Sequence, residues 1–447
     1  MLDSGLAVKG PREDAHLNRP GDGKDTCLRN HSLIRTLVGL TGNPRGCVYT
    51  EPLWGIPFNL YTPYVSVFMV ALGLTDSDIG LIVSIGWGSQ LVWALLSGVI
   101  TDKLGRRLTT LVFDILAWGV PSLISALAQN FWWFLVAIII NGVWRVTHNS
   151  WTCLLVEEAD PDQLVDIYTW VYISNTMVGL VAPLAGLMIA QYTLVPTMRG
   201  LYLFAAVMFT VKAFVTYAAT RETRQGEIRM RETRHQSLAH ILGGYLGVVR
   251  DVLRSPRTLS TAGIMLVLSI GWMISGNFWA ILATEKLHIA DQDLATFPFV
   301  KSAVMILFFF TVMPWVNRLP FRIPMVIGFI GYIVAQILLI TAPDRGFAQL
   351  ALSVALEACS FAVVSPLVDK LVVLTIDAQE RARVQSILSF TVITLTAPFG
   401  WIAGALSTLN KDLPFMLSIA LFLAGAGLAL LAGYLADRHM LVEASQI

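Results

Sequence analysis

Twelve predominantly apolar runs follow one another along the chain, separated for the most part by short polar turns. A helix needs about 20 apolar residues to cross the hydrocarbon core of a bilayer, and each run reaches roughly that length. The runs cover residues 49–72, 77–100, 109–128, 131–155, 165–191, 199–220, 259–284, 294–316, 324–342, 347–373, 384–407 and 412–435. The pattern therefore predicts an all-α integral membrane protein with twelve transmembrane helices.

One long polar segment, residues 221–258, interrupts this rhythm after the sixth run. It divides the predicted helices into an N-terminal bundle at 49–220 and a C-terminal bundle at 259–435, flanked by tails at 1–48 and 436–447. The first part of the segment is too polar to bury any surface. Apolar residues recur at helical spacing in its second part, which predicts a helix along the inner membrane surface or against the bundles.

The two predicted bundles share traces of internal similarity. A shift of 215 positions places Asp102-Lys-Leu-Gly-Arg-Arg107 on Asn317-Arg-Leu-Pro-Phe-Arg322, and it places Pro183 in the fifth run on Pro398 in the eleventh. A shared shift at two remote places supports two equivalent, pseudo-symmetric halves. Prolines interrupt the hydrogen bonds of a helix, so we expect bends at Pro183 and Pro398.

Composition supports the same fold class. The 447 residues are 55% hydrophobic and 14% charged, which is too little charge to cover the surface of a soluble protein. The four cysteines lie far apart and show no metal-ligand spacing. The chain also lacks the G-x-x-x-x-G-K-S/T motif of a nucleotide site. We therefore expect no cofactor, no metal site and no nucleic-acid partner.

The placement of Lys and Arg predicts the orientation, because cytoplasmic turns of membrane proteins are enriched in both. Most of the 31 such residues fall in the first tail, the 221–258 segment and the turns on the same side. The turns on the other side hold only Arg199, Lys286, Arg345 and Lys411. We therefore expect a multi-pass protein of the plasma membrane with both termini in the cytoplasm.

The turn between the second and third runs reads Gly98-Val-Ile-Thr-Asp102-Lys103-Leu-Gly105-Arg106-Arg107. It holds one carboxylate among three cations. A generic basic turn would explain the cations, but neither the glycines nor the aspartate. The turn resembles the signature loop G-x-x-x-D-K/R-x-G-R/K-R/K between the second and third helices of the major facilitator superfamily of secondary transporters, with every defining position present.

The resemblance implies a latch between the two halves on the cytoplasmic side. Asp102 would sit against the N-terminal end of the eleventh helix, where unpaired N–H groups attract an anion. Arg106 and Arg107 would face the acidic turn after the fourth helix, and breaking these contacts would release the inward-open state. The expected latch residues are Gly98, Asp102, Lys103, Gly105, Arg106, Arg107, Glu157, Glu158, Arg381 and Arg383.

A charge in the middle of a span costs about 2.5–3.5 kcal/mol, so each one needs a partner or a hydrated cavity. The fourth run places Asn141, Arg145 and Asn149 on one helical face, with His148 beside them. Arg145 resembles the family's helix-4 arginine, which is associated with proton coupling, although His148 and Asn149 replace the expected Gln and Gly. Glu51 in the first run is the expected partner of Arg145 or His148. Both residues also have purely structural interpretations. Arg145 would hold helix 4 against helix 1, and Glu51 would interact favourably with the positive end of its own helix dipole.

Other polar residues in the spans are candidates for a substrate cavity. Lys301 and Glu357 come at similar depths in the eighth and tenth runs, so we expect an ion pair between them, either functional or static. Asp114 and Lys212 are interpreted as satisfying local hydrogen bonds, or in the case of Lys212 as reaching for the membrane surface. The remaining cavity candidates are Asn59, Asn141, Asn149, Asn175 and Asn277.

These patterns predict a transporter that works by alternating access, and not an enzyme. Because apolar and aromatic residues dominate the expected cavity helices, our first hypothesis is proton-coupled efflux of small amphipathic organic compounds. The alternative is a proton symporter that imports a sugar or an organic anion. An integral-membrane enzyme or sensor is a third class, but the few ionisable groups in the spans form no recognisable catalytic set. The expected partners are a small-molecule substrate, a proton and the lipid bilayer.

Overall fold

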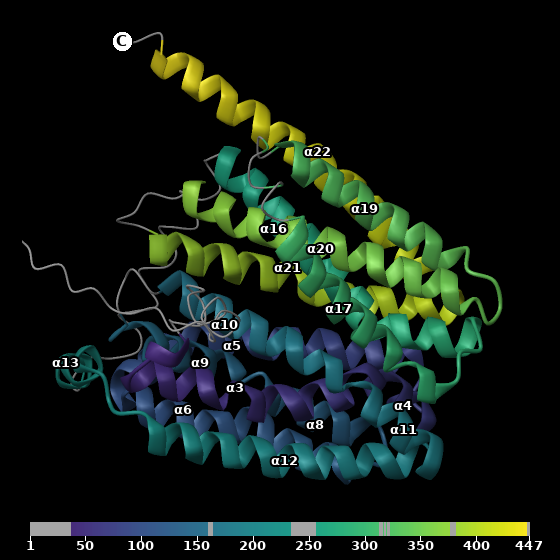
Figure 1. The fold of residues 1–447 in the computed structure, drawn as a ribbon, viewed down its shortest axis with the longest axis horizontal. Coiled ribbons are helices and arrows are strands. Elements are labelled where there is room, and N and C mark those ends of the chain that lie inside the picture. The colour runs from purple at the N-terminus through teal and green to yellow at the C-terminus, as the bar shows by residue number, and fades with distance from the viewer. Residues whose placement is uncertain are drawn as a thin grey trace, which may run out of the picture. The chain divides into compact units, whose positions relative to one another are not determined.

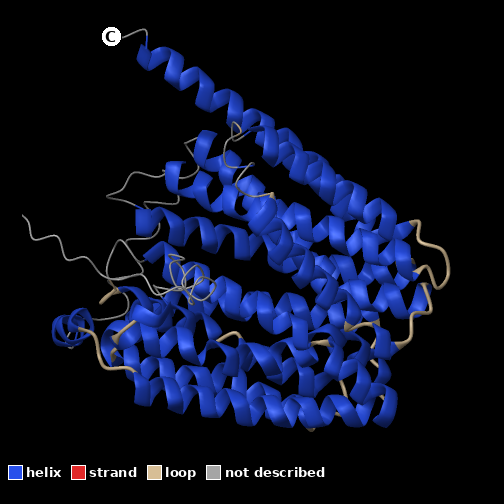
Figure 2. Cartoon of the chain, viewed as in Figure 1, coloured by secondary structure: helices blue, strands red, loops and turns tan. Residues whose placement is uncertain are grey.

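The computed structural model describes residues 37–159, 164–233, 256–312, 316, 319, 322–375 and 381–444. Contacts divide the chain into Met1–Leu40 and Thr41–Ile447, and the helices named below all belong to the second unit. Every element of secondary structure in the described residues is helical (Figure 2). The predicted all-α fold class is confirmed.

The helices form two successive sets, which we call the first and the second half (Figure 1). The first half comprises α3 (Gly42–Tyr61), η1 (Thr62–Tyr64), α4 (Val65–Ala71), α5 (Asp76–Leu104), α6 (Arg106–Asp114), η2 (Ile115–Gly119), α7 (Val120–Ala126), α8 (Phe131–Asn141), α9 (Trp144–Val156), α10 (Leu164–Val178), η4 (Gly179–Val181), α11 (Pro183–Tyr192) and α12 (Leu194–Ala219), followed by α13 (Arg224–Thr233). The second half comprises α16 (Pro256–Ile281), η5 (Leu282–Lys286), η6 (Asp291–Asp293), α17 (Thr296–Thr311), α19 (Arg322–Ile340), α20 (Phe347–Thr375), α21 (Arg381–Leu409) and α22 (Leu413–Ala444).

Each of the twelve predicted spans coincides with one of these helices or with consecutive ones. Within the described residues, ten helices are long and apolar enough to cross a membrane. The first span is described as α3 and α4, which are separated by a 3₁₀ turn at Thr62-Pro63-Tyr64. The eighth is described as α17, which has 16 residues. Turns of this kind are common where a proline enters a helix.

The two expected proline bends differ in form. Pro183 is the first residue of α11, directly after the 3₁₀ turn η4, so the fifth span is broken there. Pro398 lies inside α21, which remains one helix from Arg381 to Leu409. Two further irregular segments, the π-helical turns η2 and η5, carry no proline and were not expected.

Helices α5 and α21 join the two halves along an extensive contact (Figure 1). The contact requires small residues, because a Cβ atom added to Gly80 would lie 2.4 Å from the carbonyl oxygen of Gly400. Ser84 Oγ accepts a hydrogen bond from the backbone N–H of Trp401 at 2.6 Å. Close backbone approach of this kind is how helices associate inside a bilayer.

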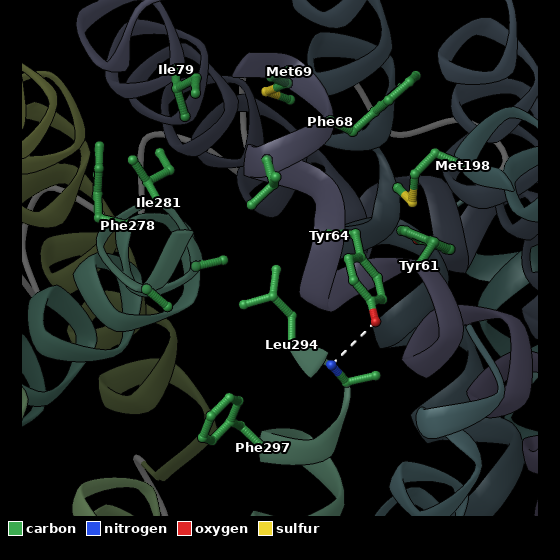
Figure 3. Packing of buried hydrophobic residues seen from close by; sticks show 14 of the residues in the cluster. Tyr61, Tyr64, Phe68, Met69, Ile79, Met198, Phe278, Ile281, Leu294 and Phe297 are labelled. Atoms are coloured by element: carbon green, nitrogen blue, oxygen red, sulfur yellow. Dashed lines mark hydrogen bonds between the residues drawn. The ribbon is translucent and has the colours of Figure 1, made fainter. Parts of the chain in front are cut away.

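A buried apolar core also extends across both halves. It includes Tyr64 and Ile79 of the first half and Phe278 and Leu294 of the second (Figure 3). The Tyr64 hydroxyl accepts a hydrogen bond from the backbone N–H of Ala295 at 3.1 Å, which is the dashed line in Figure 3. This core lies toward the end of the helices that carries the turn between α21 and α22, which we call the opposite end.

The other end carries the turn at Gly105 between α5 and α6, and we call it the basic end. Here the expectation that residues 221–258 begin with a segment too polar to bury anything was wrong. The helix α13 packs on α5, and its Gly226 and Thr233 are buried. The reason is hydrogen bonding rather than apolar surface: Thr233 Oγ1 donates to the Asp102 carbonyl at 3.2 Å. The predicted surface helix in the second part of the segment lies outside the described residues.

The first and the last spanning helices are also longer than predicted. Helix α3 begins at Gly42, before the predicted start at 49. Helix α22 continues to Ala444, past the predicted end at 435. Hydropathy locates the apolar centre of such helices, whereas their ends depend on local hydrogen bonds that it does not register.

Candidate functional site

At the basic end, Arg106 is the centre of a cluster of charges. Its guanidinium contacts Asp102 Oδ1 at 2.9 Å and Glu157 Oε1 at 3.2 Å, and its side chain is only 5% exposed. Thr223 Oγ1 donates a further hydrogen bond to Glu157 at 2.5 Å. A buried arginine with two carboxylate partners is well compensated. The structure thus brings together three of the expected latch residues.

Glu222 completes this cluster from the segment after α12. Its two carboxylate oxygens accept hydrogen bonds from the backbone N–H groups of Arg106 and Arg107, at 2.9 and 3.0 Å. These are the first two N–H groups of α6, which otherwise have no partner within the helix. Gly105 precedes them with a φ of +83°, a conformation that favours glycine. Glu222 was not among the expected residues, because the first part of residues 221–258 was expected to be too polar to bury any surface.

We expect Glu222→Ala to destabilise the protein by about 1–2 kcal/mol, because two N–H groups of α6 lose their acceptor. Thermal unfolding in detergent measures the loss. The matched control is Glu227→Ala on α13, which removes an exposed glutamate from the same region. Equal unfolding temperatures for the two variants would contradict the capping role.

Arg107 and Glu158, two further residues of the expected latch, contact other partners. Arg107 does not face Glu158: its Nε donates to the Tyr217 carbonyl at 2.9 Å, and its guanidinium stacks on the Tyr217 ring at 3.8 Å. Glu158 instead accepts from the Asn43 side chain at 3.0 Å and from the Arg224 backbone at 3.3 Å. The second arginine of the turn therefore fastens α6 to α12, because the stacked aromatic ring lies on that helix.

Asp102 pairs with Arg106 four residues later, and its expected contact with the N-terminal end of the eleventh helix stays a prediction. The side chains of Arg381 and Arg383 lie outside the described residues. Gly98 and Lys103 are exposed, and a Cβ atom added to Gly98 would meet nothing within 4 Å. Among the described residues, the contacts of the basic turn stay within the first half and α13.

A second cluster is buried inside the first half and was not expected. Lys212 Nζ on α12 contacts Asp114 Oδ2 on α6 at 2.6 Å, and the two side chains are 6% and 5% exposed. Thr147 Oγ1 on α9 donates to the other oxygen of Asp114 at 2.7 Å. The interpretation that Lys212 reaches for the membrane surface was wrong, because a carboxylate at its own depth holds it inside.

Glu51 belongs to this cluster and not to Arg145. It is buried on α3 and interacts electrostatically with Lys212 and Asp114. No hydrogen bond or ion pair joins it to another described residue. The predicted pairing with Arg145 or His148 is corrected for a geometric reason: α3 packs more extensively on α12 than on α9. Thr50, the neighbour of Glu51, shares a hydrogen bond of 2.9 Å with Thr216 of α12.

Arg145 on α9 has neutral neighbours. Its Nε donates to Gln90 Oε1 of α5 at 3.1 Å, and its guanidinium stacks on the ring of Trp144 at 4.2 Å. His148 makes an edge contact with the same ring. No carboxylate of the described residues pairs with Arg145, so the guanidinium retains donors for an anionic group.

The five candidate asparagines differ in whether their side chains bond to their own helix, to a neighbouring helix or to no described group. Asn59 and Asn277 donate to carbonyls of their own helices, as expected for locally satisfied residues. Asn141 donates to the Ala117 carbonyl and Asn149 to Thr101 Oγ1, so both connect neighbouring helices. Asn175 Oδ1 is buried and has no hydrogen-bond partner in the described structure.

In the second half the structure brings Lys301 and Glu357 together. Lys301 Nζ on α17 lies 3.0 Å from Glu357 Oε1 on α20, with 39% of the lysine side chain exposed. Ser275 Oγ on α16 lies 3.2 Å from both oxygens of Glu357, and Lys301 Nζ lies 6.0 Å from the Phe361 ring centre. Three helices of the second half thus converge on one carboxylate, although the role of the pair remains a prediction.

The opposite end holds a clasp of charges that crosses between the halves. Lys411, in the turn after α21, contacts Asp76 of α5 and Glu285 of η5, both at 2.6 Å. Ser407 Oγ also donates to Asp76 Oδ2, at 2.5 Å. Burial alone would lower the pKa of Lys411, but the hydrogen bonds from its ammonium to Asp76 and Glu285 outweigh it, and the pKa is raised. Lys411 therefore remains a cation, which keeps the clasp intact.

Sequence analysis used Lys411 only to orient the chain, because nothing in its own turn showed which residue of the first half it would meet. A second pair at the same end, Lys286 with Asp412 at 2.6 Å, lies wholly within the second half. Among the described residues, no group of three or more His, Cys, Asp or Glu side chains is placed to hold a metal ion.

Comparisons with known proteins agree with this arrangement of helices. The sequence pattern of the Major Facilitator Superfamily matches residues 54–401. The Quinolone resistance protein NorA of Staphylococcus aureus is 31% identical over 84 residues, which are 19% of this chain and only 21% of that protein. The crystal structure of a mutant of the nucleoside transporter NupG has a TM-score of 0.67 at 14% identity, covering 88% of this chain and 98% of that one. A POT family transporter in complex with a thioalcohol conjugated peptide has a TM-score of 0.67 at 15% identity, covering 90% and 99%.

Proposed function

This chain belongs to the major facilitator superfamily of membrane transporters, and we propose that it exports small amphipathic organic compounds in exchange for protons by alternating access. The solved structures named above share its fold only, since their identities are 14% and 15%. The short match to a quinolone resistance protein is consistent with efflux. The basic end would lie in the cytoplasm, together with both termini.

The observation that carries proton coupling is the charge balance around Lys212. The Lys212 ammonium pairs with Asp114, and the buried Glu51 carboxylate interacts with both at longer range inside a bundle of membrane-spanning helices. With all three ionised, the cluster has a net negative charge, which is costly in a low-dielectric interior. Asp114 already accepts hydrogen bonds from Lys212 and Thr147. Protonation of Glu51 is the simplest change that makes the cluster neutral. Glu51 is therefore the proposed proton carrier.

The contacts that join the two halves support the proposed alternating motion. At the opposite end, Lys411 holds Asp76 to Glu285 across the halves, and Tyr64 meets Ala295. At the basic end, Arg106 and Asp102 are occupied with each other. We therefore assign this arrangement to a state closed at the opposite end. Release of the clasp, with the signature turn becoming the link between the halves, would give the other state.

We expect Lys411→Met to favour opening at the opposite end. Two charge-assisted hydrogen bonds, each worth about 1.5–3 kcal/mol, are lost only in the closed state. In a background without native cysteines, a cysteine in place of the buried Ala295 should react roughly a hundredfold faster or more with a membrane-impermeant thiol reagent, since every 1.4 kcal/mol lost from the closed state corresponds to a factor of ten. Lys286→Met is the matched control, because its ion pair stays within the second half. Similar labelling in both variants would contradict the clasp.

Proton coupling and direction are tested together in liposomes that contain the purified protein and a pH-sensitive dye. Addition of an amphipathic cation such as ethidium should move protons in the direction opposite to the solute. Solute flux without proton movement would remove the coupling proposal, and proton movement in the same direction would replace export by symport.

One observation favours a second candidate, a proton symporter for an organic anion. Arg145 has neutral partners and no carboxylate among the described residues, so a substrate carboxylate would be its natural counter-ion. The same liposomes distinguish the two proposals if benzoate is tested beside ethidium. Proton movement driven by benzoate, lost in Arg145→Gln, would favour the symporter.

A further inference from the structure

A groove at the basic end lies outside every cluster described so far. It has a volume of about 770 Å³ and runs between the start of α3, the end of α9 and the end of α12. Its lining combines two arginines, Arg45 and Arg221, with the apolar side chains of Leu53, Val215 and Ala219. Such a combination suits a ligand with a charged head and an apolar body.

Neither arginine of the groove forms an ion pair with a carboxylate of the described residues. Arg45 is exposed and its guanidinium lies 5.3 Å from the Tyr49 ring centre, while no carboxylate of the described residues pairs with it. Arg221 is exposed too, and its backbone is fixed by Asn43, which accepts from its N–H at 2.7 Å and donates to its carbonyl at 3.0 Å. The two cations therefore line one groove without an ion-pair partner among the described residues.

The one carboxylate that lines the groove is already engaged. Glu158 accepts hydrogen bonds from the Asn43 side chain and from the Arg224 backbone, one on each oxygen. It therefore serves to position the segment of backbone that carries Arg221, and is less free to compete for the guanidinium groups. The groove as a whole retains a net positive charge, which attracts an anion.

The apolar wall places this anion at the membrane boundary. Val215 is 41% exposed, and it lies in α12, one of the helices long and apolar enough to cross a membrane. Ala219 is the last residue of that helix, and Arg221 follows two residues later. The groove therefore passes from hydrocarbon depth at Val215 and Leu53 to the polar interface at Arg45 and Arg221.

From this gradient we propose that the groove binds one anionic phospholipid, with its phosphate between Arg45 and Arg221 and an acyl chain along Leu53 and Val215. Guanidinium groups bind phosphate through paired N–H donors, and basic pockets between spanning helices are suited to anionic headgroups. A bound lipid would connect α3 to α12 at the end where α3 carries no acidic residue in its first turn. The site is independent of the proposed transport reaction.

The test uses the full-length protein, purified and delipidated in detergent, and measures lipid binding by native mass spectrometry. Dioleoylphosphatidylglycerol and dioleoylphosphatidylcholine are the probes. We expect the anionic lipid to bind roughly tenfold more tightly than the zwitterionic one, in line with the loss of about one charge-assisted bond. The double variant Arg45→Gln/Arg221→Gln should abolish this preference, and Arg45→Lys/Arg221→Lys should retain part of it.

Arg229→Gln is the matched control, because Arg229 is an exposed arginine of the same end that pairs with Glu232 outside the groove. Equal binding of the two lipids, or an unchanged preference in the double glutamine variant, would overturn the site. Displacement of the anionic lipid by millimolar inorganic phosphate would overturn the lipid assignment, since the groove would then take a free anion. Because binding is measured without transport, these outcomes do not depend on the proposed function.

Discussion

Lys212→Met is expected to destabilise the protein by about 3–5 kcal/mol, the usual cost of removing one partner of a buried ion pair. The cost is large here because two carboxylates depend on one ammonium. Asp114 loses a contact of 2.6 Å, and the buried Glu51 carboxylate loses a nearby cation. Thr147 keeps its hydrogen bond to Asp114 but supplies no charge. Unfolding measured in detergent or in bicelles reports the difference.

Two comparisons make this result specific. Arg229→Gln breaks an ion pair whose side chains are 48% and 52% exposed, and such pairs contribute under about 1 kcal/mol. Asp114→Asn added to Lys212→Met removes the orphaned charge, so the double variant should be more stable than Lys212→Met alone. Lower pH should also reduce the loss in Lys212→Met, because protons can neutralise the unpaired carboxylates. Similar stabilities for Lys212→Met and Arg229→Gln would show that the pair is not buried in the membrane protein.

Hydropathy alone predicted the fold because the membrane imposes it. Spanning segments must satisfy their own backbone hydrogen bonds, so a run of about 20 apolar residues has to form a helix. The same argument fails at the places where other forces act. It did not locate the 3₁₀ turn at Thr62-Pro63-Tyr64 or the π-helical turn at Ile115–Gly119, which depend on single residues and on packing.

The site was predictable where two opposite charges lie at equal depth. That reasoning identified Lys301 and Glu357, which the structure joins at 3.0 Å. Applied to the first half, it would also have paired Asp114 with Lys212, since each lies a few residues from the basic end of its helix. Instead each was considered separately and treated as a local residue. The signal was present in the sequence, and comparing depths across helices would have found it.

Other partners could not be predicted from spacing because they depend on how helices rotate against one another. Glu51 faces α12 and not α9, because α3 packs this face on α12. Glu222 caps α6 from a mainly polar segment, and that composition gave no sign that the following helix α13 would pack on α5. The signature motif located the basic turn correctly, but a motif describes a set of residues and not the conformational state in which they meet.

Glu51→Gln is expected to reduce solute-driven proton movement to the level of empty liposomes while leaving exchange of labelled for unlabelled solute intact. The reason is that glutamine resembles the protonated carboxyl in size and charge but cannot release a proton. In the proposed cycle Glu51 must lose its proton on one side of the membrane, and it is buried on α3, which packs on the helix that carries Lys212. The variant would therefore remain able to reorient with substrate bound, but would no longer couple that step to a proton.

The pair of measurements separates this role from a structural one. A merely structural Glu51 would impair exchange and proton movement together, whereas a proton carrier affects the second alone. Glu232→Gln is the control, because it removes an exposed carboxylate of α13 that pairs only with Arg229 among the described residues. Proton movement that persists in Glu51→Gln would transfer the role to Asp114 or to the Lys301–Glu357 pair, and Glu357→Gln in the same liposomes decides between them. Since Asp114 is bound by both Lys212 and Thr147, whereas Glu51 has no hydrogen-bond partner in the described residues, Glu51 is the carboxyl group from which a proton can leave with the least rearrangement.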